Sequence, residues 1–373
     1  MQSVEALSVA IAQPSQVVDL EAMYDEIGSR ELRVCHLFED PQRSGVPRCI
    51  INTMLVGDPE ANGYTAISYT WIADEYSWYG RSLPRTTQLR VDGEVVEIAA
   101  YVAHIIAQVY QAGMRTVWID CLCINQADER EKGHLVGLVG DIFRQAQDVL
   151  VFLGKPSTYT DDALGMDASL LLTPGNDSGR PTTINRLVLP EPLAFPSRPN
   201  SSGSEISEGE QIPEIRSEFT GLLGYRYWQR AWVIQEIALA KRIRLLCGNR
   251  DLVHPVAREL IRRLGHETGT NASVDAIARF SMSTAPDILN VVVETRKAQC
   301  SNPRDIVFAK LALARNGHLV GQPNYTESVE ICFTRFALSH IRHTSTLDVL
   351  RYAGENEETP SWVLNWTDQW DLG

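Results

Sequence analysis

The chain has 373 residues, of which 44% are hydrophobic and 22% are charged, and its formal net charge is −13. This composition is typical of a globular protein, and the length allows two domains or one elaborated domain with a large core. The negative charge argues against broad nucleic-acid binding, and there is no run of about 18 apolar residues to suggest a membrane span. Because the amino-terminal stretch lacks the basic region of a secretory signal, we expect a cytoplasmic protein.

The seven cysteines are scattered and odd in number, which indicates reduced thiols rather than a disulfide framework. Cys121 and Cys123 form a C-x-C pair, but no second pair or suitably spaced histidine accompanies them. We therefore expect two small residues packed beside a strand end, and no zinc. The chain also lacks an HExxH motif and a glycine-rich phosphate loop, so we predict no metal and no resident cofactor.

The first part of the chain contains several strand patterns. Strand-compatible runs occupy 31–38, 49–56 and 64–69. Within 89–98, Asp92-Gly93 between β-branched residues predicts a β-hairpin.

Helical patterns then alternate with strands. Apolar spacing indicates a helix over 97–112 and another over 129–147, with a buried strand at 148–154. Gly133, Gly137 and Gly140 weaken the second helix by up to about 1 kcal/mol each relative to alanine. The alternation favours an α/β fold with a parallel or mixed sheet.

The second half begins with a change in composition. Residues 155–215 are rich in proline, glycine, serine and acid, which predicts a flexible insertion. Beyond it, 224–240 is predicted to be a helix with an aromatic face and 242–248 a strand. The remainder has a mainly helical pattern, at 253–265, 270–283, 284–299, 303–315 and 326–343, and ends on an aromatic tail (Trp362, Trp366, Trp370).

The most informative stretch is Arg115 to Asp128, with the sequence RTVWIDCLCINQAD. A short apolar run ends on Asp120, and a polar cluster follows at Asn125, Gln126 and Asp128. A buried strand that carries a carboxylate at its carboxyl end, followed by a polar loop, is how an open α/β sheet presents a site.

This stretch is also part of a family resemblance, because WIDxxCINQ resembles the central motif of the fungal heterokaryon-incompatibility (HET) domain. Three further blocks resemble the same family, in the same order. The four blocks are YTAISYTW at 64–71, VWIDCLCINQADEREK at 117–132, YRYWQRAWVIQEIALAKRIRLLCG at 225–248, and SNPRDIVFAKLALA at 301–314 with PNYTESVE at 323–330 and PSWVLNW at 360–366. The resemblance covers roughly 64–366, and a match of this extent identifies the chain as a member of the family.

The resemblance implies a domain organisation and a fold. Residues 61–250 would form the HET domain, preceded by N-terminal strands in 1–60 and followed by a helical region in 251–373 that packs on it. HET domains are remotely similar to Toll/interleukin-receptor (TIR) domains, which implies a TIR-like or flavodoxin-like, mostly parallel sheet flanked by helices.

The resemblance also implies a function, namely non-self recognition (heterokaryon incompatibility) with programmed cell-death signalling. Some TIR domains cleave NAD with a glutamate in a W-C-x-x-E-L type motif. The segment 232–237, WVIQEI, is similar to that motif and makes Glu236 the counterpart of the catalytic acid. NAD would then be a substrate, and the partner would be a second copy of the chain or a second incompatibility protein.

In NAD cleavage, the nicotinamide leaves as a neutral base while oxocarbenium character develops on the ribose. A carboxylate beside that ring stabilises the charge, as in glycoside hydrolysis, and this is the role expected of Glu236 with Asp120 as its partner. The expected ligand-binding residues are aromatic rings for stacking, amides for hydrogen bonding and a guanidinium for phosphate, namely Tyr69, Trp71, Trp232, Asn125, Gln126 and Arg230.

Each of these residues also has a structural interpretation. Asp120 could cap the helix after its strand, and Asn125 and Gln126 could fix a loop through its backbone. Glu236 could form an ion pair with an arginine such as Arg304. The tryptophans at 118, 228 and 232 could be core residues, and Arg304 and Asp305 could tie the helical region to the sheet.

Two alternative functions therefore stay open. One is a non-catalytic module for protein interaction or oligomerisation, favoured by Ile72 in place of the glycine usual after the first-block tryptophan and by the acidic segment 201–214. The other is a HET domain repurposed as a small-molecule biosynthetic enzyme, which an apolar pocket too narrow for a dinucleotide would favour.

Overall fold

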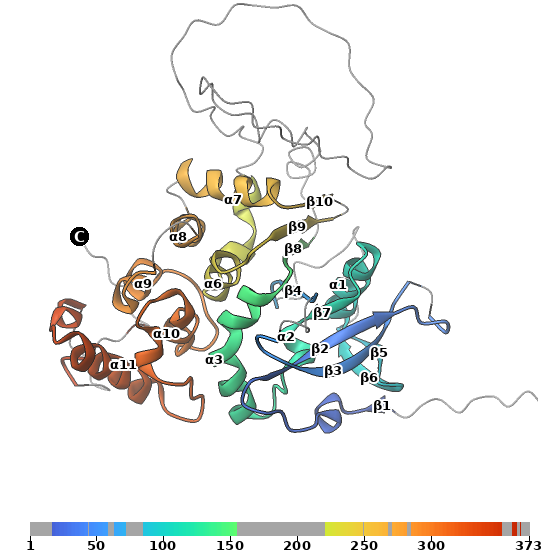
Figure 1. The fold of residues 1–373 in the computed structure, drawn as a ribbon, viewed down its shortest axis with the longest axis horizontal. Coiled ribbons are helices and arrows are strands. Elements are labelled where there is room, and N and C mark those ends of the chain that lie inside the picture. Colours follow the sequence, from blue (N-terminus) through green and yellow to red (C-terminus); the bar gives the residue numbers. More distant parts are fainter. Residues whose placement is uncertain are drawn as a thin grey trace, which may run out of the picture.

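The computed structural model shows the path of the chain in Figure 1. The residues that it describes are 17–43, 45–58, 63–71, 85–154, 221–248, 250–267, 271–281, 285–352, 360–363 and 366. The predicted insertion at 155–215, Ile72 and Trp370 lie outside the described residues.

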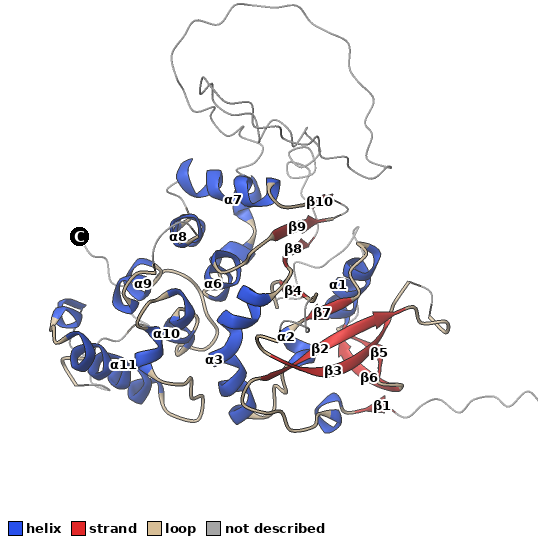
Figure 2. Cartoon of the chain, viewed as in Figure 1, coloured by secondary structure: helices blue, strands red, loops and turns tan. Residues whose placement is uncertain are grey.

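The described strands form one ten-stranded mixed sheet with the order β1-β6-β5-β3-β2-β7-β4-β8-β9-β10. Their bounds are β1 Val17–Val18, β2 Glu31–Phe38, β3 Arg48–Leu55, β4 Thr65–Ser68, β5 Thr86–Val91, β6 Glu94–Ala99, β7 Thr116–Trp118, β8 Asp148–Gly154, β9 Ile243–Cys247 and β10 Arg250–Leu252. Figure 2 distinguishes these strands from the helices that surround them.

The centre of the sheet is a run of four parallel strands, β7-β4-β8-β9. Numbered by their order in the sequence, these strands follow the pattern 2-1-3-4, which is the order of flavodoxin-like sheets. In such sheets ligands bind at the carboxyl ends of the strands, near the point where the strand order reverses. That point lies between β4 and β8, and the chain leaves β4 at Ser68.

The N-terminal strands extend this sheet on the β7 side. β2 pairs antiparallel with both β7 and β3, and β5 and β6 form the hairpin predicted around Asp92-Gly93. Both turn residues have positive φ, 51° at Asp92 and 90° at Gly93, as a two-residue hairpin turn requires.

The helices are shorter than the apolar patterns predicted. Their bounds are α1 Ala100–Gln111, α2 Asp120–Cys123, α3 Glu129–Gln145, α6 Trp232–Ala238, α7 Val256–Glu267, α8 Ala272–Phe280, α9 Ile288–Glu294, α10 Asp305–Phe308 and α11 Val329–Thr344. The predicted continuous helix at 224–240 is wrong, because 226–229 forms a 3₁₀ turn and Arg230 then pairs with Gln299 in an isolated bridge. Residues 97–99 belong to β6, and the predicted helix at 303–315 is α10 followed by a 3₁₀ turn at Leu311–Leu313.

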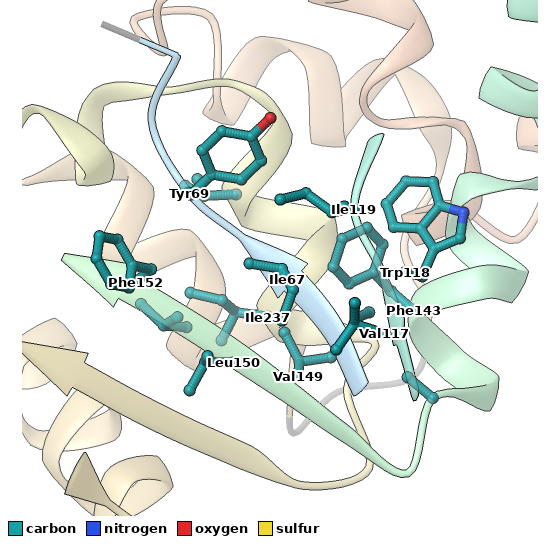
Figure 3. Packing of buried hydrophobic residues seen from close by; sticks show 14 of the residues in the cluster. Ile67, Tyr69, Val117, Trp118, Ile119, Phe143, Val149, Leu150, Phe152 and Ile237 are labelled. Carbon is teal, nitrogen blue, oxygen red and sulfur yellow. The ribbon is translucent and has the colours of Figure 1, made fainter. Parts of the chain in front are cut away.

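The main core lies between the central strands and the helices α3 and α6. Figure 3 shows Ile67 of β4, Val117 of β7 and Leu150 of β8 packed with Phe143 of α3 and Ile237 of α6. A second buried cluster belongs to the C-terminal helical region, around Phe308, Phe333 and Phe336. In Figure 1 this region lies beside α3 and α6.

The glycines of α3 permit this contact between α3 and the C-terminal region. A Cβ atom at Gly140 would lie 2.0 Å from the Cβ of Ala312, and one at Gly133 would lie 2.8 Å from the carbonyl oxygen of Pro323. The same glycines that weaken α3 as an isolated helix therefore let the C-terminal segment approach its backbone.

The expected fold class is confirmed: an α/β sheet flanked by helices, followed by a mainly helical C-terminal region. The sheet is mixed, because the antiparallel strands β2, β3, β5 and β6 extend its parallel centre. None of the seven cysteines, all of which lie in described segments, forms a disulfide bond. Among the described residues, no helix is both long enough and apolar enough to cross a bilayer.

Candidate active site

A cavity of about 670 Å³ opens where the carboxyl ends of β4 and β7 meet α3, α6 and the C-terminal region. Both predicted catalytic carboxylates, Asp120 and Glu236, line it. The other predicted ligand-binding residues that line it are Tyr69, Trp71, Gln126, Arg230 and Trp232. The structure thus brings together residues that are up to 167 positions apart in the chain (236 − 69).

Asp120 is the first residue of α2, two positions after the end of β7 at Trp118, and aromatic donors hold its carboxylate. The Tyr69 hydroxyl donates to Oδ1 at 2.7 Å and the Trp71 indole donates to Oδ2 at 2.9 Å. The Cys121 amide also donates to Oδ1, at 2.8 Å, and Asp120, the first residue of α2, lines the cavity. Burial raises the pKa of Asp120, while the two aromatic donors and the nearby Arg230 charge oppose that rise.

Glu236 lies in the middle of α6 and is 7% exposed. The Ser68 hydroxyl, at the end of β4, donates to its Oε2 atom, and the Tyr227 hydroxyl lies 2.5 Å from the Ser68 oxygen. When Ser68 donates to Glu236, Tyr227 donates to Ser68, so the three groups form a chain that fixes one carboxylate oxygen. Burial raises the pKa of Glu236, and the Arg230 charge and the Ser68 hydrogen bond oppose this rise.

Arg230 provides positive charge to both carboxylates. Its guanidinium donates to the backbone carbonyl of Tyr69, so it is anchored to the segment that follows β4. Its charge opposes the effect of burial on the pKa of Asp120 and also on that of Glu236. The positive charge of Arg230 therefore stabilises the ionised forms of both Asp120 and Glu236, whose negative charges repel each other.

A third carboxylate, Asp305 of α10, lines the same cavity. The Tyr325 hydroxyl donates to Oδ1 at 2.6 Å and the Trp232 indole donates to Oδ2 at 3.0 Å. Asp305 is thus held by one tyrosine and one tryptophan, as Asp120 is, but from the C-terminal region. The sequence interpretation has Asp305 tie the helical region to the sheet, and its bond to Trp232 instead ties that region to the helix α6.

Cations complete the charged lining. Lys132 of α3 lies 4.9 Å from the centre of the Tyr325 ring, and Arg226 also lines the cavity. Lys310 does not line the cavity, and its side chain is buried, with 1% exposed. Its ammonium donates to the carbonyl oxygen of Ala231 at 2.7 Å. Burial lowers the pKa of Lys310 to about 7.

Two predicted amides differ in their placement. Asn125 lies in the loop before α3, where its backbone amide donates to Glu131 at 2.7 Å and its side-chain oxygen accepts from Ala127 at 3.1 Å. These bonds match the structural interpretation of Asn125. The side-chain amide of Gln126 donates to the backbone carbonyl of Asp120 at 3.2 Å. Gln126 also lines the cavity, so it both fixes the loop and is placed to contact a ligand.

Two other structural alternatives are resolved by the contacts. Arg304 does not take the role of partner to Glu236, because it donates to the Glu327 carbonyl and to Asn302. Trp228 is fully buried and donates to the Leu222 carbonyl, so it is a core residue. Trp118 is also buried, with 2% exposed, but it reaches the cavity wall.

Sequence reasoning missed several residues of this site. Ser68 lies within the YTAISYTW block, but its bond to Glu236 spans 168 positions and leaves no local signal. Lys310 did leave one, since it is a lone charge inside the apolar run IVFAKLALA. A charged residue in such a run is either buried or ends the helix or strand, and in both cases it is a candidate for a specific structural role.

Comparison with known proteins agrees with the sequence motifs. Residues 64–236 match the family described as heterokaryon incompatibility protein (HET). The chain is 24% identical over 394 aligned residues to heterokaryon incompatibility protein 6, OR allele, of Neurospora crassa, an alignment that covers 85% of this chain and 55% of that relative. No solved structure matches the chain significantly. The match to the HET family thus spans residues 64–236, and the motifs of the chain occur in the family's order.

Proposed function

We propose that this chain acts in fungal non-self recognition, and that its HET domain hydrolyses NAD⁺ to nicotinamide and ADP-ribose. The family match and the name of the Neurospora relative support the role in heterokaryon incompatibility. One observation carries the proposed chemistry: the buried Glu236 carboxylate lines a cavity together with Asp120 and Arg230, at the carboxyl ends of the parallel strands.

In the proposed reaction, the bond between the ribose C1′ atom and the nicotinamide nitrogen breaks, and its electron pair goes to nicotinamide. A water oxygen then bonds to C1′, and the proton of that water passes to a carboxylate and on to solvent. Glu236 in its ionised form stabilises the positive charge that develops on the ribose. Asp120 accepts a hydrogen bond from a ribose hydroxyl or orients the water.

The size and polarity of the cavity suit a dinucleotide better than a small apolar metabolite. Its volume of about 670 Å³ lies within the range of about 300–1,000 Å³ typical of ligand pockets. Its lining includes three carboxylates, and the cationic side chains Lys132, Arg226 and Arg230. NAD⁺ has a pyrophosphate for the cations and a cationic ring for the carboxylates, so its charges complement this lining.

We propose in addition that depletion of NAD⁺ is the cell-death signal, and that self-association or a second incompatibility protein controls it. Assembly would then raise the activity of each chain. The proposal predicts a rate per chain that increases with protein concentration, because assembly follows mass action.

The experiment is incubation of the purified chain with NAD⁺ over a range of protein concentrations, with nicotinamide and ADP-ribose quantified by chromatography. Equal amounts of both products are expected from the wild type. Glu236→Gln should abolish their release, whereas Glu294→Gln, which removes an exposed carboxylate outside the cavity lining, should leave it unchanged. If no nicotinamide appears at any concentration, the hydrolase proposal fails and the non-catalytic alternative is favoured.

A further inference from the structure

The buried lysine at position 310 has no role in the reaction described above and does not line the cavity, yet Glu236 and Asp305, which do line it, act on its charge. Its side chain is 1% exposed. Burial of an ammonium group is costly unless nearby groups compensate it, so a lysine in this position requires a physical reason.

The hydrogen bond of Lys310 connects it to the helix that carries Glu236. Its ammonium donates at 2.7 Å to the carbonyl of Ala231, the residue directly before α6. Asp305, five positions earlier in the chain, accepts from the indole of Trp232, the first residue of α6. The C-terminal segment thus holds the beginning of α6 at two successive residues.

The charges around Lys310 come from three separate segments. Glu236 of α6, Asp305 of α10 and Cys300 are the titratable groups whose charges favour the ammonium form. Cys300 is half-buried, and burial together with the Asp305 charge raises its pKa to about 11, so its thiol is neutral near pH 7. The two carboxylates are therefore the groups that compensate the lysine charge.

The interaction between Lys310 and Glu236 is reciprocal, as the charge of each stabilises the charged form of the other. Glu236 must be ionised to stabilise an oxocarbenium ion, but its burial favours the neutral acid. Lys310 does not line the cavity, so its positive charge counters that tendency without occupying the space of a ligand.

We propose that Lys310 is a positioning residue of the active site, which fixes the start of α6 through the Ala231 carbonyl and supplies a buried positive charge to the helix that carries Glu236. This inference rests on the proposed NAD⁺ hydrolysis for its kinetic consequences. Its structural half, the coupling between Lys310 and Glu236, is independent of any substrate.

The test uses two substitutions that separate the charge from the hydrogen bond. Lys310→Met removes both, whereas Lys310→Gln keeps a donor for the Ala231 carbonyl and removes the charge. Lys310→Arg keeps the charge, and Lys297→Met removes an exposed lysine from a neighbouring segment as the control. Thermal unfolding shows which variants are folded, and the comparison is made among those.

The kinetic readout is the pH dependence of nicotinamide release. Both neutral variants should move the acidic limb of the kcat profile to higher pH, so that kcat falls most at the acidic end of the profile, with little change in KM. Lys310→Arg should restore the limb toward its wild-type position. A folded Lys310→Gln enzyme with a wild-type pH profile would overturn the proposal, because the lysine would then act only as a hydrogen-bond donor.

The second readout needs no substrate and distinguishes this proposal from the hydrolase proposal. In protein labelled with ¹³C at the glutamate side-chain carboxyl, the Glu236 signal is assigned by its loss in Glu236→Gln and followed through a pH titration. Its midpoint should rise in Lys310→Met and Lys310→Gln and stay unchanged in Lys297→Met. An unchanged midpoint in the Lys310 variants refutes the coupling, whether or not the wild type hydrolyses NAD⁺.

Discussion

The Ser68 hydroxyl at the end of β4 donates a hydrogen bond to the Glu236 carboxylate of α6. Ser68 is the last residue of the central strand β4. Glu236 belongs to α6, the helix that precedes β9, and β8 separates β9 from β4 in the sheet. The bond therefore ties the proposed catalytic acid to a fully buried central strand, and the Tyr227 hydroxyl forms a second hydrogen bond with Ser68.

Removal of this bond should shift the pH dependence of the proposed reaction. The Ser68 hydrogen bond helps to lower the pKa of Glu236 against the effect of burial, so Ser68→Ala should raise that pKa and move the acidic limb of the kcat profile to higher pH. A hydrogen bond to a charged group contributes about 1.5–3 kcal/mol, which predicts a loss in kcat of about 10- to 150-fold. Ser339→Ala, which removes a buried hydroxyl bonded to the Leu319 carbonyl, is the control and should keep wild-type kinetics.

The buried pair between Arg33 of β2 and Glu131 of α3 should be important for stability. Its two contacts measure 2.5 Å and 3.0 Å, and both side chains are less than one-tenth exposed. Arg33→Met leaves Glu131 buried without its partner and should lower the free energy of unfolding by about 3–5 kcal/mol. Arg144→Met breaks a pair of the same 2.5 Å length between half-exposed groups and should cost less than about 1 kcal/mol. Equal losses in urea unfolding would contradict this distinction.

Two glycines of α3 should respond to alanine in opposite directions. At Gly140 the new methyl would lie 2.0 Å from the Ala312 Cβ, so overpacking should cost about 1–3 kcal/mol and loosen the C-terminal region. At Gly137, which is exposed, the nearest atom is the flexible end of Gln322, and the better helix propensity should stabilise by up to about 1 kcal/mol. Thermal unfolding of both variants checks the signs, and stabilisation by Gly140→Ala would refute the close approach.

Lys310 should make stability depend on pH. Its pKa is about 7 in the folded protein and 10.5 in the unfolded chain, so between these values the unfolded chain binds the additional proton. The free energy of unfolding therefore rises with pH across this window by up to about 1.4 kcal/mol per pH unit from this group. The full cost of the buried charge is present below pH 7.

Lys310→Met lacks this contribution. The stability of the variant relative to the wild type should therefore be most favourable near pH 6 and decline toward about pH 9, as measured by urea unfolding at several pH values. A difference between the two proteins that stays constant over this range would show that Lys310 does not titrate in the folded state.

Most strands could be predicted from the sequence, because their signals are local. Alternation and β-branched residues located β2 and β8, and Asp92-Gly93 located the hairpin turn. The helix predicted at 224–240 failed for a long-range reason. The Gln229 carbonyl accepts a hydrogen bond from the Gln299 amide, 70 positions away, and this pairing breaks the helix before Trp232.

The candidate site could be predicted only in part, because some of its residues stand in local motifs and others are brought in by long-range contacts. Asp120 and Glu236 stood in recognisable motifs, and the structure places both at one cavity. Their supporting contacts come from partners with no sequence proximity: Ser68 for Glu236, Tyr325 for Asp305, and Lys310 for Ala231. No local pattern encodes such pairs, so they emerge only when the C-terminal region packs against α3 and α6.

The most direct measurement of the central claim compares binding and turnover in Glu236→Gln. Calorimetry with NAD⁺ should show one site per chain in this variant, because Tyr69, Trp71 and Arg230 still line the cavity, while nicotinamide release from the same sample should fall at least about 100-fold below the wild-type rate. A Glu236→Gln protein that binds NAD⁺ and releases nicotinamide at the wild-type rate would contradict the assignment of Glu236 as the catalytic residue.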